Sequence, residues 1–204
     1  MSRKLCLGLL VGFLNILWIG LASGGTYPIH IQYQRTGSFP LCKRIGGTLG
    51  LNPIRDKRSN QQHVGRYVNP RRVVSYLECI PAPLGKAIED ALSQCLSRRG
   101  VKVTLGLKWD GKEESLKSIE TDSALMVEVE RFWTEGTDTI GKPKTNTSIY
   151  LTVRLGIKRE GRVVTRQIFT SKALILYPFS PDRIEQMVNR SLADLFDSFL
   201  SSIM

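Results

Sequence analysis

Residues 149–157, IYLTVRLGI, carry the clearest alternation of apolar and polar side chains in the sequence. A period of two residues is typical of a strand that buries one face. A turn at Glu160–Gly161 follows, and a second extended run covers Val163–Leu174. The two runs therefore predict a long antiparallel hairpin. The apolar positions of the first run are Ile149, Leu151, Val153, Leu155 and Ile157.

Two other segments have the apolar spacing of amphipathic helices. One runs from about Pro83 to Arg99 and stops before Gly100, a residue suited to the left-handed position after a helix. The other begins at Ser180, whose hydroxyl is expected to cap it, with Pro181 in the first helical position. Each helix has one apolar stripe to bury against a sheet. The stripe of the second helix comprises Ile184, Met187, Val188, Leu192, Leu195, Phe196, Phe199 and Leu200.

Shorter extended runs complete the predicted sheet. They are Tyr27–Tyr33, Arg44–Leu51, Val101–Val103 and Leu125–Trp133, whereas residues 54–83 are expected to be a loop with two edge-strand pieces, Val64–Val68 and Val73–Leu77. In the last run, Phe132 and Trp133 are both expected to lie in the core, with an exposed contact patch as the alternative. The order of these elements predicts an α+β sandwich, with a mostly antiparallel sheet and the two amphipathic helices packed on one face. Residues 26–204 are expected to form this single domain.

Residues 1–25 have the pattern of an export signal. Arg3 and Lys4 precede an apolar run that ends in small residues at 22–25, which is typical of a cleaved signal peptide. An uncleaved anchor is the alternative, because the run is close to the minimum length that crosses a bilayer. Residues 21–23 also resemble the tripeptide before the lipidated cysteine of bacterial lipoproteins, but Gly24 follows instead of a cysteine.

Export makes a disulfide possible, because compartments outside the cytosol are oxidising. Three cysteines follow the predicted signal, so at most one internal disulfide can form. Cys95 lies on the apolar stripe of the first helix and is expected in the core. Cys42 and Cys79, which lie in extended or loop sequence, are therefore the candidate pair.

The basic excess of the chain is unevenly distributed. The formal net charge is +11, and residues 25–110 hold 14 Lys/Arg against 5 Asp/Glu, whereas residues 111–204 hold 13 of each. Such a segment could meet an acidic protein, anionic lipid headgroups or an anionic polymer, although a solvated basic loop is the alternative. We expect no nucleic-acid partner, because no nucleic-acid-binding module is recognisable. The candidate residues for partner or anion binding are Arg55, Lys57, Arg58, Arg66, Arg71 and Arg72.

No cofactor or metal site is expected from the motifs. Residues 136–142, GTDTIGK, almost match a phosphate-binding loop, but Pro143 stands where that loop needs Ser or Thr. A hairpin loop is therefore expected there. Neither Cys-x-x-Cys nor His-Glu-x-x-His spacing occurs.

The sequence contains no clear arrangement of catalytic side chains, so we expect that the protein is not an enzyme. Glu128 and Glu130 lie two residues apart on one strand face and could act as paired carboxylates. A solvated sheet face is the simpler interpretation, with cross-strand ion pairs to Arg131, Arg154 and Arg166. A Cys–His nucleophile would need His63 beside Cys42 or Cys79.

Several short motifs occur in a recognisable order. They are Ile29-His30-Ile31-Gln32-Tyr33, Asp56-Lys57-Arg58 followed by Val64-Gly65, Arg99-Gly100-Val101, and Glu130-Arg131-Phe132-Trp133 before the long hairpin and last helix. In this order, over most of the chain after the signal, they resemble the YajG-type envelope lipoproteins of Gram-negative bacteria, with an architecture like the N-terminal domain of TolB. The resemblance implies a non-enzymatic accessory protein that faces the periplasm. Gly24 departs from the family's lipidated cysteine.

The sequence thus predicts an exported, non-enzymatic accessory or scaffold protein that binds a protein partner of the cell envelope. The partner is expected to contact either the sheet surface or the basic segment Arg55–Arg72. The alternative is a component of an envelope transport system that binds anionic lipid or glycolipid. We expect the protein in the periplasm or on a periplasm-facing membrane of a Gram-negative bacterium.

Overall fold

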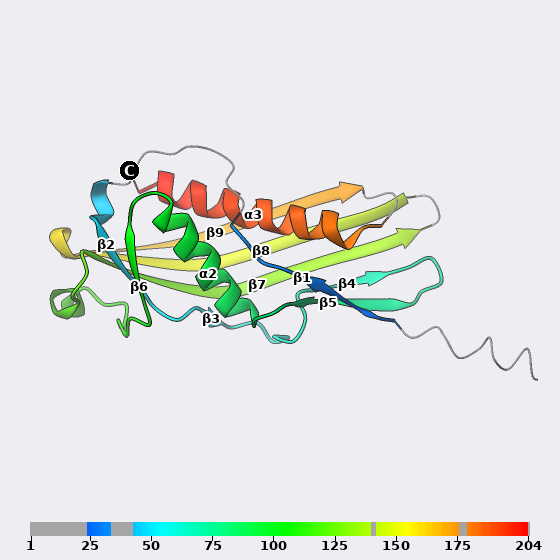
Figure 1. Ribbon diagram of the computed structural model, residues 1–204, viewed down its shortest axis with the longest axis horizontal. Coiled ribbons are helices and arrows are strands. Elements are labelled where there is room, and N and C mark those ends of the chain that lie inside the picture. The colour runs from blue at the N-terminus through cyan, green and yellow to red at the C-terminus, as the bar shows by residue number, and fades with distance from the viewer. Residues whose placement is uncertain (1–23, 34–42, 140–141, 176–178, 204) are drawn as a thin grey trace, which may run out of the picture.

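The computed structural model describes residues 24–33, 43–139, 142–175 and 179–203. A nine-stranded sheet forms its centre, and three long strands dominate this sheet (Figure 1). They are β7 (Ser123–Thr139), β8 (Lys142–Ile157) and β9 (Arg162–Ile175). The long hairpin predicted from the alternation is confirmed, because β8 and β9 pair antiparallel over the whole of β9. A short 3-10 helix, η3 (Lys158–Glu160), and Gly161 form the turn between them.

The other side of β7 is lined end to end by three short strands. These are β2 (Thr48–Leu51), β3 (Arg55–Asp56) and β4 (Gly65–Val68), and each pairs parallel with β7. Beyond them, β6 (Lys102–Leu105) pairs parallel with β2. At the other end, β5 (Val74–Cys79) pairs antiparallel with β4, and β1 (Thr26–Ile29) pairs parallel with β5. The two remaining 3-10 turns are η1 (Lys43–Ile45) and η2 (Glu114–Ser118).

The prediction of a mostly antiparallel sheet is wrong, because the sheet is mixed and most of its pairings are parallel. Antiparallel pairing occurs only where a short connection reverses the chain, at β4–β5, β7–β8 and β8–β9. In contrast, β2, β3 and β4 follow one another along β7 without a reversal. After β5, the helix α2 (Leu84–Ser97) connects the chain to β6, which runs parallel to its neighbour β2.

Both predicted helices are confirmed, as α2 (Leu84–Ser97) and α3 (Pro181–Ser201). The hydroxyl of Ser180 accepts a hydrogen bond from the backbone N–H of Arg183 at 3.4 Å, so the predicted cap of α3 is present. The apolar stripes of both helices share one core with the alternating residues of β8. The two helices therefore cover the same face of the sheet, as predicted (Figure 1).

A β-bulge in β7 decides which side chains enter this core. Before the bulge, Val127 and Val129 are buried against the helices. The register then shifts between Val129 and Arg131, which leaves Glu130 without an opposite residue on β8. Phe132 consequently points into the core, with 1% of its surface exposed, whereas Trp133 lies half-buried on the other face. The core assignment is thus confirmed for Phe132 and wrong for Trp133.

The face of the sheet away from the helices is only partly covered. A small cluster of Trp109, Leu116, Ile119, Ala124 and Met126 covers the beginning of β7 there. It approaches Gly156 so closely that a Cβ atom on this residue would lie 2.3 Å from Leu116 Cδ2. Further along the strands, no described helix lies over this face.

The described helices include none that is both long and apolar enough to cross a membrane. The predicted export signal lies outside the described residues, apart from Gly24 and Gly25.

Candidate functional site

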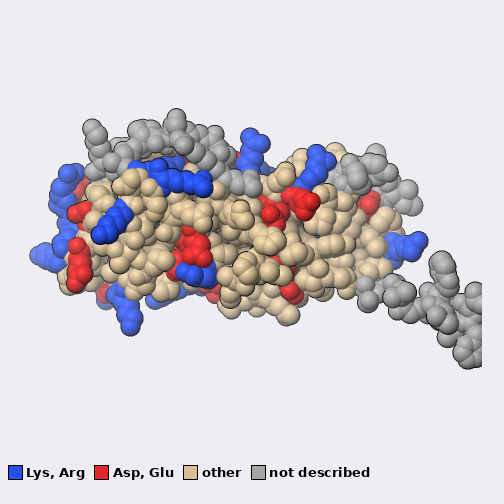
Figure 2. All heavy atoms as spheres, in the orientation of Figure 1, with Lys and Arg blue, Asp and Glu red and all other residues tan. Residues whose placement is uncertain are grey.

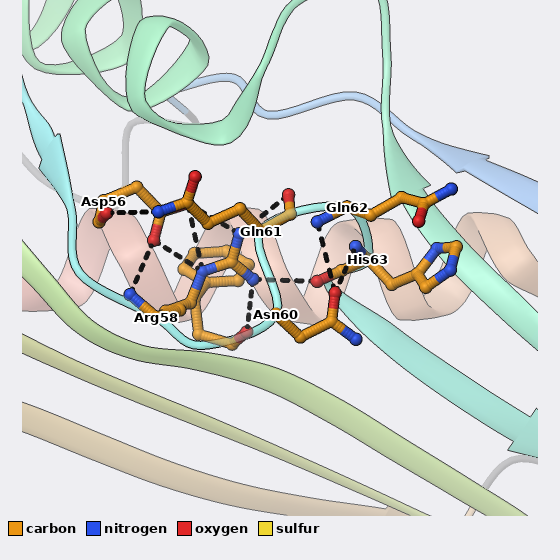
Figure 3. A network of polar contacts seen from close by, with 7 residues as sticks. Asp56, Arg58, Asn60, Gln61, Gln62 and His63 are labelled. Carbon is orange, nitrogen blue, oxygen red and sulfur yellow. Dashed lines mark hydrogen bonds and ion pairs between the residues drawn. The ribbon is translucent and has the colours of Figure 1, made fainter.

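Arg58, one of the predicted binding residues, is buried inside the molecule with 8% of its surface exposed. Its Nη2 donates to Asp56 Oδ2 at 2.7 Å, and its Nε donates to Asp56 Oδ1 at 2.9 Å. Its Nη1 donates to the backbone oxygens of His63, at 2.8 Å, and Phe132, at 3.1 Å (Figure 3). Arg58 therefore ties the loop after β3 to the middle of β7, and its guanidinium is not available to a partner.

Arg55 and Lys57 are engaged by carboxylates of β7. Because β3 lies beside β7 with Arg55 opposite Glu128, both basic side chains reach that carboxylate. Lys57 Nζ lies 2.9 Å from Glu128 Oε2, and Arg55 Nη1 lies 3.8 Å from Glu128 Oε1. Lys57 Nζ also lies 3.8 Å from Glu130 Oε1.

Glu128 and Glu130 therefore form no open pair of carboxylates for acid–base chemistry. Glu128 is only 5% exposed and is neutralised by β3. Its ion pairs are with Arg55 and Lys57 and not with the predicted cross-strand partners Arg131, Arg154 and Arg166.

The other three candidates lie on β4 and in the turn that follows it. Arg66 is paired with Glu135 on β7, at 2.7 Å between Nη2 and Oε1. Arg71 and Arg72 are exposed in the β4–β5 turn, which the side chain of Asn69 holds by accepting hydrogen bonds from the N–H groups of Arg71 and Val73. Of the six predicted binding residues, only Arg71 and Arg72 are thus both exposed and without an ion pair in the described structure.

His63 and Cys79 show no nucleophile–base arrangement. The ring of His63 stacks on Tyr76, with 4.3 Å between ring centroids, and its Nδ1 lies 3.3 Å from Glu78 Oε1. Cys79 is a free thiol, and its predicted disulfide partner, Cys42, lies outside the described residues. Burial raises the pKa of Cys79 to about 11 despite the nearby charge of Arg58. The thiol is therefore protonated near neutral pH and is not an activated nucleophile.

The third cysteine behaves as predicted. Cys95 is fully buried in the core, and burial raises the pKa of its thiol to about 11 as well. Within the described ranges, no group of three or more His, Cys, Asp or Glu side chains is placed to hold a metal ion.

Since the folded pKa of Cys79 lies above the ordinary value of 9.0, this thiol stabilises the fold below pH 9.0. The contribution is lost as the pH rises through about 11.

We expect Cys79 to react with iodoacetamide about 100-fold more slowly at pH 8 in the folded, reduced protein than in urea, because its raised pKa lowers the thiolate fraction. Peptide mass mapping measures the labelling of each cysteine. Equal rates in folded and unfolded protein would contradict the burial of Cys79, and omitting the reductant tests the Cys42–Cys79 disulfide.

The structure contains an exposed surface that the sequence did not single out, the outer edge of β9. Within the described chain, β9 pairs with β8 on one side and with no strand on the other. Phe169 is 74% exposed and Ile175 is 69% exposed, although both lie in a strand. A long edge to which no described strand is paired is unusual, because its unpaired N–H and C=O groups can bind another strand.

A groove with basic walls runs between this edge and α3. It has a volume of about 390 Å³, and Lys172, Leu174, Arg183, Met187 and Arg190 are among the residues that line it. Lys172 Nζ lies 2.5 Å from Asp194 Oδ2, so one basic side chain is neutralised. Arg183 and Arg190 are exposed and have no ion pair with any described residue.

The sequence does contain an excess of basic residues around β9, but a count over the whole second half of the chain does not show it. Residues 140–175 hold eight Lys/Arg and one Asp/Glu. The neighbouring strand β7 holds four of the compensating carboxylates, Glu128, Glu130, Glu135 and Asp138. The others lie between residues 113 and 122 and in α3, so the second half of the chain sums to zero. Figure 2 shows Lys and Arg side chains gathered at the end of the molecule where the β8–β9 turn lies in Figure 1. Much of the rest of the visible face is uncharged.

No family model and no curated protein sequence matches this chain. Among solved structures, it is similar to the protein XCC0632 of Xanthomonas campestris, described with the family name DUF330, at a TM-score of 0.55 and 13% identity. That alignment covers 86% of this chain and 91% of the Xanthomonas protein. An uncharacterized protein matches with a TM-score of 0.50 and 12% identity, over 89% of this chain and 99% of its own.

Bacterial lipoproteins are also among the similar solved structures. A minor lipoprotein of Acinetobacter baumannii aligns over 77% of this chain and 91% of its own, at 11% identity and a TM-score of 0.40. At that score the likeness carries no argument. For the two better matches, identities of 13% and 12% show a shared fold and nothing of function.

Proposed function

We propose that the chain is a non-enzymatic accessory protein of the bacterial cell envelope that binds a protein partner through the β9 side of its sheet. The single observation that carries this proposal is the open edge of β9, with Phe169 74% exposed. An exposed aromatic side chain next to unpaired backbone groups is a typical anchor for another protein. The YajG-type resemblance and the export pattern of residues 1–25 support the envelope location.

Site-specific photocrosslinking in intact cells tests this function. We expect p-benzoylphenylalanine in place of Phe169 to yield a crosslinked protein, whereas the same group in place of Lys117, an exposed residue of η2, yields none. Mass spectrometry of the adducts identifies their chemical class. Adducts to lipid or glycolipid would favour the alternative function, and the absence of any adduct at position 169 would contradict partner binding at this surface.

Charge reversal at Arg71 and Arg72 tests the second predicted surface in the same cells. We expect the double variant R71E/R72E to lower the yield of the adduct at position 169, because both basic side chains are exposed. Its free energy of unfolding should remain within about 0.5 kcal/mol of the unmodified protein, since neither side chain is buried. An unchanged yield would refute a role of this turn in partner binding.

A further inference from the structure

The backbone of β9 has the features of a strand that accepts another strand. It is 14 residues long, and its register with β8 is continuous from Arg162 to Ile175. It contains no proline and no bulge, two of the devices by which edge strands resist pairing. Among the described residues, the outer edge receives no backbone–backbone hydrogen bond from a helix or loop, and near its start the N–H of Val163 donates to the carboxylate of Glu113 at 3.1 Å.

The register of β9 defines the two sides on which an added strand would place its side chains. Ile168 lies opposite Leu151, so Ile168 and the residues two and four positions away from it face the helices. Phe169 lies opposite Tyr150 on the other face of the sheet. A strand paired with β9 would therefore alternate between the α3 groove and the uncovered face.

The helix side of this edge selects acidic side chains. Arg166 and Lys172 lie on that side of β9, and Arg183 and Arg190 face the same groove from α3. The one carboxylate at the groove wall, Asp194, is already paired with Lys172. A Glu or Asp side chain from an added strand would thus meet Arg183 and Arg190, which are unpaired in the described structure.

The other side selects apolar side chains. Phe169 and Ile175 are both exposed there, and Ala173 lies between them. A hollow of about 700 Å³ lies at this end of the strands. Ala173, Leu174 and Ile175 line it on β9, and its lining on β7 and β8 includes the charged residues Glu135 and Lys144. Covering Phe169 and Ile175 removes apolar surface from water, which stabilises a complex.

We propose that β9 binds an extended segment of the partner by strand addition, and that this segment alternates between acidic side chains in the α3 groove and apolar side chains over Phe169 and Ile175. The inference rests on the proposed function and names the chemistry of its partner. A second copy of β9 fits this edge less well. In the antiparallel register that pairs Phe169 with Phe169, Arg166 would lie directly opposite Lys172, and like charges in that position are destabilising.

Fluorescence anisotropy with a labelled peptide of about ten residues, alternating Glu and Val, tests the proposal on the purified protein. We expect saturable binding of this peptide and none of the Lys–Val peptide of equal length. A Glu–Val peptide with an N-methyl group on every residue should not bind either, because it has no N–H to donate from either edge to the backbone ladder. Equal binding of the N-methylated peptide would overturn strand addition, and equal binding of the Lys–Val peptide would overturn the preference for acidic side chains.

Charge reversal localises the binding. We expect R183E/R190E to weaken the affinity for the Glu–Val peptide by about tenfold or more, because two unpaired groove arginines become acidic. The matched control K102E/K108E makes the same charge change at exposed residues around the distant strand β6 and should leave the affinity within about twofold. Equal losses in the two variants would overturn the groove assignment and leave only a general charge effect.

The cellular crosslink at position 169 separates the two proposals. A protein adduct at Phe169 without binding of the Glu–Val peptide would overturn strand addition while the proposed function stands. Absence of both would overturn the proposed function as well. Light scattering measures self-association: a dimer of the purified protein that is lost in the variant S171P, which removes an N–H from the outer edge of β9, would assign the edge to a second copy and overturn an acidic partner.

Discussion

Replacing Arg58 with alanine is expected to lower the free energy of unfolding by about 3–5 kcal/mol, because it leaves buried groups without their partner. The substitution removes the ion pair to Asp56 and the hydrogen bonds to the backbone oxygens of His63 and Phe132. Desolvated acceptors that lose their donor are more costly than the net value of the bonds themselves. Chemical denaturation followed by circular dichroism measures the change.

The control for this prediction is Arg71→Ala, which removes another arginine from the same basic segment. Arg71 is exposed, so the free energy of unfolding is expected to change by no more than about 0.5 kcal/mol. Similar denaturation midpoints for Arg58→Ala and the unmodified protein would contradict the buried network in Figure 3. A variant that does not fold would agree with the prediction, and Arg58→Lys, which keeps the charge but not the fork of donors, should then fold with intermediate stability.

Much of the fold was predictable, because its largest elements have strong periodic patterns. β8, β9, α2 and α3 are each long enough for their apolar spacing to identify the element without any knowledge of its neighbours. The cap at Ser180 and the stop before Gly100 are also local signals. These elements contain most of the core, and the structure confirms the two helices on one face.

The direction of the short strands could not be predicted in the same way. β3 has two residues and β2 and β6 have four each, which is too short for a periodic pattern. Whether such a strand runs parallel or antiparallel depends on where the connection returns the chain. Only a short hairpin loop fixes the direction locally, so the sequence favoured antiparallel pairing where the structure has parallel pairing.

The prediction that the basic residues of Arg55–Arg72 are free to bind a partner was limited for a related reason. The sequence shows that basic residues are concentrated between Arg55 and Arg72, but their acidic partners on β7 are far away in the chain. Arg66 and Glu135, for example, are separated by 69 positions and meet only because β4 pairs with β7. A charge count over half the chain therefore overestimated how many basic side chains of Arg55–Arg72 are free of ion pairs. The same count did not reveal the basic groove beside β9.

The bulge at Glu130 is the clearest case in which a single extra residue decides the packing. Strict alternation from Val127 and Val129 would continue into the core at Arg131 and Trp133. The shift in register instead sends Phe132 into the core, and the charged Arg131 stays exposed. An aromatic residue is available in either register, so the local signal that distinguishes the two outcomes is the charge of Arg131, which strict alternation would bury.

Phe132→Ala is accordingly expected to lower the free energy of unfolding by about 3–5 kcal/mol, the usual range for deleting a buried aromatic side chain. Phe132 is 1% exposed and contacts the common core, so its removal leaves a cavity there. The matched variant Trp133→Ala should lose only about 1–2 kcal/mol, because half-buried apolar surface contributes less. Urea denaturation of both variants measures the difference. The opposite order of stabilities would mean that Trp133 is the core residue and that β7 continues past Glu130 without a bulge.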